Sequence, residues 1–473
     1  MSDKIEVREI KPSRPRPAAK TKMGDQPVHP NNTIYVRAMK GVFQRLRRYG
    51  GWFLMALFML TPWIPYQGRQ AILLDIEAQQ FNFFSVTLFP QDLILLAFVF
   101  MIAAFALFFF TTFLGRVWCG YTCPQTVWTF IYIWFEEKIE GARNKRVKLD
   151  RTAWNFEKLW RKTFKHFCWL AVALVTGITM VAYFVPASDV VFGLVTGELS
   201  FAATFSVIFF MLATYANAGW MRTIVCTHMC PYARFQSAMF DKDTFIVGYD
   251  VDRGEARGPR KRKEDYKAVG LGDCVDCNLC VEVCPSGIDI RNGLQYECIN
   301  CGACIDACDQ TMDKMGYEKG LISYTTEHRL AGGTTEFVRP KLIGYGLALV
   351  VMMIAFVVTA NLRVNFEVDV LRDRNQMFRE TNEGWIENTY TLVLVNKTQQ
   401  ATQFHLSVEG LPPYEWSGPQ QIEVAAGDVA DVPISLAVDP YELTSPMTRI
   451  EFVVTTDSSD DARRIDSRFF SRR

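Results

Sequence analysis

The chain has 473 residues, 49% of them hydrophobic, and carries a formal net charge of +1. This length suits two to four structural units, and the near-zero charge argues against a nucleic-acid partner, which would need a dominant basic face. Thirteen cysteines are present and none follows Cys308, a distribution that does not fit the spread pairs of a small secreted disulfide scaffold.

Residues 1–47 form the first predicted segment, a polar cytoplasmic tail. Residues 1–46 include proline-rich stretches and lack the apolar core of a cleavable signal peptide. We expect residues 1–33 to be disordered, because such a composition buries too little apolar surface to offset the entropy of ordering the chain.

Five apolar stretches are long enough to cross a bilayer, which requires about 20 residues. They are residues 48–66, 91–114, 166–186, 199–219 and 341–361. A soluble protein can bury one such helix, but five predict a polytopic α-helical membrane protein. The first four make a membrane region over residues 48–220, and the fifth is a separate transmembrane helix.

Lysine and arginine set the predicted orientation, since they are enriched in cytoplasmic segments of membrane proteins. The first 50 residues hold 12 of them and the loop 136–165 holds 10, whereas the loops 67–90 and 187–200 hold one in total. This bias places the N-terminus in the cytoplasm. Five spans then place residues 221–340 in the cytoplasm and residues 362–473 in the periplasm.

Spans two and four each end in a Cys-x-x-x-Cys-Pro motif, which suggests a twofold internal repeat. The motif cysteines are Cys119 and Cys123 before Pro124, and Cys226 and Cys230 before Pro231. A spacing of four puts two thiols on one helix face, but the proline disfavours helix at the residue before it. We therefore expect each motif at a helix break.

The four motif cysteines form the candidate catalytic site. Thiolates favour Cu(I) over hard cations, and His228 and Met229 in the second motif add two side chains that suit copper. A third metal cluster and a pair of redox disulfides remain open, as does a simple role as small buried side chains. Cys168, alone in span three, is interpreted as such a buried side chain.

Eight cysteines between residues 274 and 308 give the strongest signal. They form two runs of Cys-x-x-Cys-x-x-Cys-x-x-x-Cys. In such tandem runs the first three cysteines bind one 4Fe–4S cluster and the fourth closes the other. The first cysteine set is therefore Cys274, Cys277, Cys280 and Cys308. The second cysteine set is Cys298, Cys301, Cys304 and Cys284. Zinc sites are the alternative, although zinc favours separated cysteine pairs.

Two such clusters carry one electron each and do no bond chemistry on their own. No nucleotide-binding glycine pattern lies beside them, so we expect the electron donor to be another cytosolic protein. The basic run 257–263 offers an acidic donor a docking surface, and a solvated linker or an inner-leaflet anchor is the alternative interpretation.

Residues 362–473 change character again. Alternating or β-branched runs begin at Thr389, Phe404, Val429 and Ile450, and turn signals separate them. About 100 residues of short strands predict an immunoglobulin-like β-sandwich.

The order of these features resembles the CcoG family, also called FixG or RdxA. The resemblance covers nearly the whole chain, and Asp309 departs from it by standing where a proline usually follows the last cluster cysteine. Members are bacterial inner-membrane proteins needed to assemble cbb3-type cytochrome c oxidase. The resemblance implies two 4Fe–4S clusters on the eight cysteines above. It also implies a cupric reductase that supplies Cu(I) for the oxidase copper centre and uses the four motif cysteines.

The implied partners are cbb3-type oxidase subunits or copper chaperones, together with the lipid bilayer, and a homodimer is left open. A quinol-linked electron conduit to a periplasmic acceptor is the alternative function. A third hypothesis is an assembly scaffold whose outer domain holds an oxidase subunit. The sequence leaves open the donor and the face at which copper is reduced.

Overall fold

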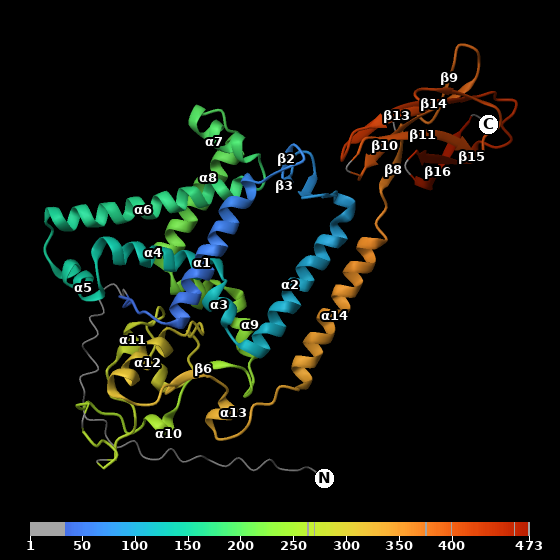
Figure 1. Cartoon of the computed structure of the whole chain (residues 1–473). Coiled ribbons are helices and arrows are strands. Elements are labelled where there is room, and N and C mark those ends of the chain that lie inside the picture. The colour runs from blue at the N-terminus through green and yellow to red at the C-terminus, as the bar shows by residue number, and fades with distance from the viewer. Residues whose placement is uncertain are drawn as a thin grey trace, which may run out of the picture. The chain divides into compact units, whose positions relative to one another are not determined.

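The computed structural model describes residues 34–262, 264–268, 270–373, 376–398, 400–457 and 459–471. The predicted disordered tail, residues 1–33, lies outside them. Figure 1 shows the helices and strands of the chain, which divides into two compact units. The first unit takes Met1–Gly51, Leu114–Ala171 and Tyr215–Thr335, and the second takes Trp52–Phe113, Val172–Thr214 and Glu336–Arg473.

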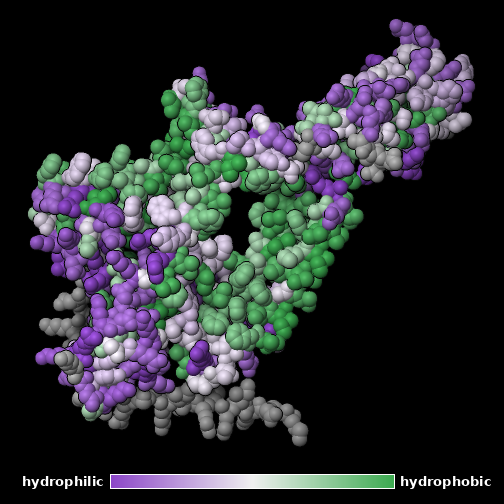
Figure 2. Space-filling model, in the orientation of Figure 1, coloured by the Kyte–Doolittle hydropathy of each residue, from purple (hydrophilic) through white to green (hydrophobic). Residues whose placement is uncertain are grey.

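Four described helices are long and apolar enough to cross a membrane. They are α2 (Leu93–Leu114), α6 (Phe156–Val181), α8 (Phe201–Thr214) with its π-helical continuation to Met221, and α14 (Pro340–Asn361). They overlap predicted spans two to five, although α6 begins at Phe156, inside the predicted loop 136–165. The apolar windows of α2 and α14 are 6% and 0% buried within the chain, as expected for helices that face lipid. Figure 2 shows the hydrophobic surface over these two helices.

The first predicted span, residues 48–66, differs from the others. Its helix α1 runs from Val42 to Leu60, and three arginines stand within its first two turns. The chain then leaves the helix at η1 (Thr61–Trp63). Because the charged start shortens the apolar stretch, α1 is not among the four helices above. The count of five spans and the sidedness of the chain stay predictions.

Two segments that we treated as loops contain regular structure. Between α1 and α2 lie short strands: β1 (Pro65–Tyr66), β2 (Arg69–Gln70), β3 (Ile72–Asp75), β4 (Gln80–Phe83) and β5 (Val86–Leu88), followed by η2 (Pro90–Asp92). Strand β3 contacts the end of α6, where the Leu74 amide donates to the Tyr183 carbonyl over 2.7 Å. Between α6 and α8 lies α7 (Ala187–Thr196), a short apolar helix. Apolar residues of these two segments pack within the second unit, as Val190 of α7 does against Val181 and Val207.

The cysteine-rich part of the first unit forms around one small sheet. Strand β6 (Ile246–Tyr249) pairs antiparallel with β7 (Ile322–Thr325). The intervening chain forms α10 (Val251–Gly254), α11 (Leu279–Glu282), η5 (Ile290–Asn292) and α12 (Ala303–Met315). Val247, Ile305 and Met312 are buried between the sheet and α12, and make this a self-contained core.

The rest of the first unit is helical. Its elements are α3 (Val117–Tyr121), α4 (Pro124–Glu140), α5 (Arg143–Arg151), the π-helices η3 (Tyr215–Met221) and η4 (Val225–Met229), α9 (Pro231–Met239) and α13 (Glu327–Leu330). The rings of Tyr132 on α4 and Trp169 on α6 stack with centroids 5.0 Å apart. Each ring also donates a hydrogen bond to the other residue's carbonyl, which fixes α4 against α6.

The C-terminal part of the second unit is an immunoglobulin-like sandwich of two antiparallel sheets. One sheet has the order β12 (Tyr414–Ser417), β14 (Val429–Val438), β10 (Ile386–Asn396) and β8 (Phe366–Arg372), and β9 (Arg379–Glu380) also pairs with β10. The other has the order β13 (Gln421–Val424), β11 (Thr402–Glu409), β15 (Met447–Thr456) and β16 (Ser459–Phe470). Tyr390, Phe404 and Phe452 are fully buried between the sheets. The predicted sandwich is confirmed.

A buried ion cluster ties the sandwich to the helix ends of the second unit. Asp92, next to α2, accepts hydrogen bonds from Arg363 after α14 (2.8 Å) and from Lys397 of the sandwich (3.0 Å). Lys397 also pairs with Glu367 over 2.8 Å. The side chains of Asp92 and Lys397 are only 8% and 3% exposed, so buried charges connect the sandwich to the ends of α2 and α14.

We therefore expect Asp92→Asn to loosen the sandwich from the helices. Removing one partner of a buried ion pair costs about 3–5 kcal/mol; here Arg363 would lose its ion pair with Asp92, and Lys397 would retain Glu367 but lose one of its two carboxylates. Limited proteolysis of the purified protein should show faster cleavage between α14 and β8. Asp466→Asn removes an exposed pair with Arg449 and serves as the control, since such pairs contribute about 0–1 kcal/mol. Equal protease sensitivity of the two variants would contradict the role of Asp92.

Candidate functional site

Two pockets in the cysteine-rich domain are lined by the eight clustered cysteines. One is lined by all four members of the first cysteine set. The other is lined by all four members of the second set, and Cys280 reaches both pockets. Each sequence run thus supplies its fourth cysteine to the pocket of the other run. This grouping supports the ligand assignment, which stays a prediction.

The loops that carry these cysteines are shaped by residues in left-handed backbone conformation. Asp276 and Asn278 have φ of 53° and 57° in the first run, and Asn300 and Gly302 have φ of 52° and 71° at the matching positions of the second. Asparagine, aspartate and glycine adopt this conformation most readily. Helices α11 and α12 start directly after Asn278 and Gly302. The repeat in the sequence therefore produces the same loop twice.

The cysteine pockets suit a metal cluster better than free thiolates. Burial raises the pKa of Cys280 and of Cys284 to about 12, and the pKa of Cys298 to about 11. A thiolate in such a pocket needs a cation beside it. Among the described residues, no three His, Cys, Asp or Glu side chains converge as ligands of one metal ion, either here or at the Cys-x-x-x-Cys-Pro motifs. Four cysteines line each apolar pocket, which is the number that holds a 4Fe–4S cluster.

Both Cys-x-x-x-Cys-Pro motifs break a helix at the second cysteine, as expected from the proline. Cys123 precedes α4, which begins at Pro124, and Cys230 precedes α9, which begins at Pro231. The first cysteines differ in their surroundings, since Cys119 lies in the short helix α3 and Cys226 lies in the π-helix η4. π-Helical turns occur frequently at functional sites.

In the structure, thiols of the two motifs lie close enough to affect one another's pKa. Burial raises the pKa of Cys119 to about 12, and the nearby Cys123 and Cys226 contribute to this rise. Burial also raises the pKa of Cys226 to about 11, with contributions from Cys123 and Cys230. The motifs are about 100 residues apart in the chain, so their proximity is a property of the fold.

The two other predicted copper ligands are less clearly placed. His228 shares a hydrogen bond of 2.7 Å with the neighbouring Thr227 hydroxyl, and Met229 is 57% exposed. Within the described part of the chain, no hydrogen bond joins His228 to the four motif cysteines. Their assignment as copper ligands stays a prediction.

The first motif packs directly on the loop of the second cysteine set. A Cβ atom added at Gly120 would lie 2.7 Å from the Ile299 carbonyl oxygen and 3.1 Å from Cys301 Cα. Next to it, the Tyr121 hydroxyl donates a hydrogen bond of 3.2 Å to the Cys301 carbonyl. The candidate catalytic thiol of Cys119 therefore belongs to a segment in van der Waals contact with the cluster-binding loop.

Gln236 is a site residue that sequence reasoning missed. Its side chain is fully buried on α9, directly after the second motif. The amide Nε2 lies 3.4 Å from Cys119 Sγ and the amide oxygen lies 3.6 Å from it. Gln236 thus joins the first motif to the helix that follows the second. Nothing in the sequence distinguishes it from an ordinary polar helix residue.

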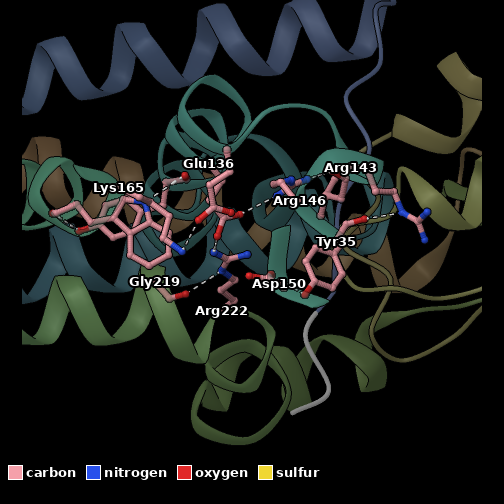
Figure 3. Close-up of polar contacts among 12 residues, drawn as sticks. Tyr35, Glu136, Arg143, Arg146, Asp150, Lys165, Gly219 and Arg222 are labelled. Carbon is pink, nitrogen blue, oxygen red and sulfur yellow. Dashed lines mark hydrogen bonds and ion pairs between the residues drawn. The ribbon is translucent and has the colours of Figure 1, made fainter. Parts of the chain in front are cut away.

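A buried charge network fixes the chain on either side of the motifs (Figure 3). Glu136, on the helix that begins at the first motif, accepts hydrogen bonds from Arg146 over 2.9 Å and from Arg222 over 2.6 Å. Arg222 lies just before the second motif, has φ of 40° and also donates to the Gly219 carbonyl. Burial opposes the ionisation of Glu136, but Arg222 and Arg146 hold its pKa below the ordinary value. One carboxylate therefore holds both motif-bearing segments.

Glu136→Gln should accordingly destabilise the protein by about 3–5 kcal/mol, because two arginines would stay buried without a counter-charge. Since the folded-state pKa of Glu136 is lowered, its contribution is present above the unfolded pKa of 4.5 and is lost as the pH falls further. Thermal unfolding in detergent should thus show a lower midpoint for the variant at pH 7 and a smaller difference in acid. Glu157→Gln, which removes an exposed pair with Arg161, is the control; an equally large loss there would count against the network.

Family models match three parts of the chain. Residues 221–327 match a 4Fe-4S dicluster domain and residues 96–140 match a 4Fe-4S binding domain. Residues 356–472 match a family described as "IG-like fold at C-terminal of FixG, putative oxidoreductase". The dicluster match contains all eight clustered cysteines, and the second match contains Cys119 and Cys123. Together with the four apolar helices, these matches define a class: polytopic helical proteins that carry ferredoxin-type iron–sulfur domains.

Full-length relatives identify the family within this class. The chain is 37% identical to Protein RdxA of Cereibacter sphaeroides over 84% of this chain and 87% of that protein. It is 35% identical to Nitrogen fixation protein FixG of Rhizobium meliloti over 80% of this chain and 79% of that protein. The chain therefore belongs to the FixG/RdxA family.

A solved structure also matches part of the chain. It is the crystal structure of a FixG-related protein from Vibrio parahaemolyticus, with 42% sequence identity. The match covers 23% of this chain and 97% of that chain, with a TM-score of 0.22.

Proposed function

We propose that the protein is a membrane-bound one-electron oxidoreductase that reduces Cu(II) to Cu(I) at the four motif cysteines. The observation that carries this proposal is the contact between the first motif and the second cysteine set, made by Gly120 and Tyr121. Clusters bound to the two cysteine sets would supply one-electron storage and transfer. Cys119 and Cys123 flank this contact, which supports electron transfer from a cluster at the second set to copper at the motif cysteines.

The motif cysteines also suit the chemistry of the substrate. Thiolates bind Cu(I) more tightly than hard oxygen ligands do, so a thiol site stabilises the product of the reduction. Each electron converts one Cu(II) to one Cu(I) and requires no proton. Gln236 and the Glu136 network connect the segments that carry the two motifs, which supports a site shared by both.

The family and the charge bias support a proposal about the cellular role. We propose that the protein lies in the inner membrane of a bacterium, with its ferredoxin domain in the cytoplasm and its sandwich in the periplasm. A cytosolic protein would donate electrons, and the Cu(I) would serve the copper centre of a cbb3-type oxidase through its subunits or a copper chaperone. The segregation of lysine and arginine and the order of domains support this arrangement.

Anaerobic turnover with copper tests the proposal. Protein reduced by two electrons should be reoxidised by Cu(II) and yield about two Cu(I), captured by a Cu(I)-specific chelator. Rapid reoxidation by a quinone but not by Cu(II) would support the quinol-linked conduit instead. If protein without clusters still supports oxidase assembly, the scaffold hypothesis is correct.

Iron analysis separates copper binding from a third cluster at the motifs. A family model for 4Fe-4S binding covers the first motif, which contributes two thiols to a set of four. Two clusters contain roughly eight iron atoms per chain and three contain roughly twelve. We expect the lower value, with copper bound at the motif cysteines. The higher value, lost on replacement of the motif cysteines, would overturn the copper site.

A further inference from the structure

A buried arginine stands between the second cysteine set and the two motifs. Arg116 precedes α3 and is only 6% exposed. Its guanidinium donates to the carbonyls of Tyr296 and Cys298 in the cluster-binding loop, the latter over 3.4 Å. It also donates over 3.3 Å to the carbonyl of Ala233 on α9. One side chain thus connects the first motif, the second cysteine set and the helix after the second motif.

Within the described part of the chain, no carboxylate forms a hydrogen bond or an ion pair with Arg116. Its hydrogen-bond acceptors are backbone carbonyls, and its Nε is buried without a hydrogen-bond partner among the described residues. The first cysteine set offers a contrast, because Arg291 lines its pocket and pairs with Asp276 over 2.5 Å and with Asp289 over 2.7 Å. A positive charge is therefore neutralised beside the first set and left uncompensated beside the second.

An uncompensated positive charge favours whichever state of a nearby group is more negative. The guanidinium is buried and donates to the backbone carbonyl of Cys298 itself, so its charge lies beside the second cysteine set. A cluster held by four thiolates becomes more negative when it is reduced, and its reduction potential depends on local charge. Burial of the second set disfavours that extra negative charge, and Arg116 offsets this effect.

We propose that Arg116 is a positioning residue that raises the reduction potential at the second cysteine set above that at the first. An electron that enters the ferredoxin domain is then held at the pocket beside the motif cysteines. Each set has two buried cysteines, but Cys277 of the first set is exposed and none of the second set is, so the first set is the more accessible to an external donor. The inference rests on the iron–sulfur part of the proposed function and is independent of copper.

An anaerobic redox titration followed by electron paramagnetic resonance tests this proposal without any copper. Cys277→Ala, which leaves the second set complete, assigns the two signals. In the unaltered protein the signal of the second set should appear at the higher potential. Arg116→Gln should make the second set at least about tenfold harder to reduce, which is about 59 mV for one electron. The potential of the first set should stay unchanged.

Three further variants make the outcome specific. Arg116→Lys keeps the positive charge. The equilibrium constant for reduction of the second set should therefore change by less than about threefold. Tyr296→Glu keeps Arg116 but adds a carboxylate where the Tyr296 ring now lies 4.9 Å from the guanidinium, and should lower the potential as Arg116→Gln does. If Arg116→Gln fails to assemble its clusters, Tyr296→Glu still tests the effect of neutralising the charge of Arg116. Arg262→Gln removes an exposed charge from the same domain and should move neither signal.

The proposal is overturned if the first set has the higher potential in the unaltered protein. It is also overturned if neutralising Arg116 shifts both signals equally or neither, or if Arg116→Lys shifts the second signal as far as glutamine does. None of these results would bear on whether Cu(II) is the substrate, because the titration contains no copper. A failure of this inference is therefore distinguishable from a failure of the proposed function.

Discussion

Replacing Cys119 and Cys226 together with serine should abolish Cu(II) reduction while both cluster signals survive. The two residues come from different motifs, and the fold brings their thiols within electrostatic range of each other. Serine has the size of cysteine but offers a hard oxygen that binds Cu(I) poorly. Changes to residues that support the ligands of a metal site lower metal affinity or activity by about 10- to 100-fold. The loss of two ligands should therefore reduce the turnover of Cu(II) by more than this.

Cys168→Ser is the matched control for this experiment. Cys168 lies in α6, within one of the candidate spans, and belongs to neither motif. Its replacement should leave the rate of Cu(I) formation and the iron content unchanged. If the double variant turns over Cu(II) at the rate of the Cys168 variant, the motif cysteines are not the site of reduction, and copper must meet the electron elsewhere on the protein.

The ferredoxin domain could be predicted from the sequence because its information is local. Two-residue gaps between cysteines, with Asp276, Asn278, Asn300 and Gly302 at matching positions, determine the backbone conformation of each loop. The exchange of the fourth cysteine, which brings Cys284 to the second pocket, follows from the same repeat.

The secondary structure was hardest to predict where charged residues lie within an element that also packs against the rest of the protein. The C-terminal strands that alternate cleanly were found, but β16 (Ser459–Phe470) reads as a polar segment and was missed. It pairs with β15 along an edge of the sheet, and Phe469 is its fully buried anchor. The start of α1 shows the opposite case, because an apolar run that suggests a span is preceded by arginines within the same helix.

The parts of the site that connect the motifs to the clusters could not be predicted. Arg116 contacts Cys298 across 182 positions and Cys119 contacts Gln236 across 117. Residue spacing has no bearing on such pairs, which depend on how α3, α9 and the cluster-binding loop pack. The sequence therefore predicts candidate groups for the chemistry, and the structure was needed to find Arg116 and Gln236, which connect the segments that carry them.

The contact at Gly120 allows this connection to be broken without removing any thiol. Gly120 lies within α3 and does not have a positive φ, so alanine should be tolerated by the backbone and even preferred in a helix. Its methyl group, however, would lie 2.7 Å from the Ile299 carbonyl oxygen, which is too close for any real contact. Gly120→Ala must therefore push the first motif away from the second cysteine set.

We expect Gly120→Ala to lower the rate of Cu(I) formation by roughly 10- to 100-fold, since a displacement of about 1 Å at a reacting centre has effects of that size. The overpacking should also cost about 1–3 kcal/mol of stability. Stopped-flow mixing of reduced protein with Cu(II) measures the rate, while iron content and thiol count verify that both sets and both motifs are intact.

Gly50→Ala provides the matched control, because Gly50 lies in α1 of the same unit and a Cβ atom there would meet nothing within 4 Å. That variant should keep the full rate of Cu(I) formation and, by its better helix propensity, gain up to about 1 kcal/mol of stability. An unchanged rate in Gly120→Ala, with the clash accommodated elsewhere, would mean that the packing of the first motif on the cluster-binding loop does not serve electron delivery. A selective loss at Gly120 would instead link the rate to this contact, since every candidate ligand in the chain is still present.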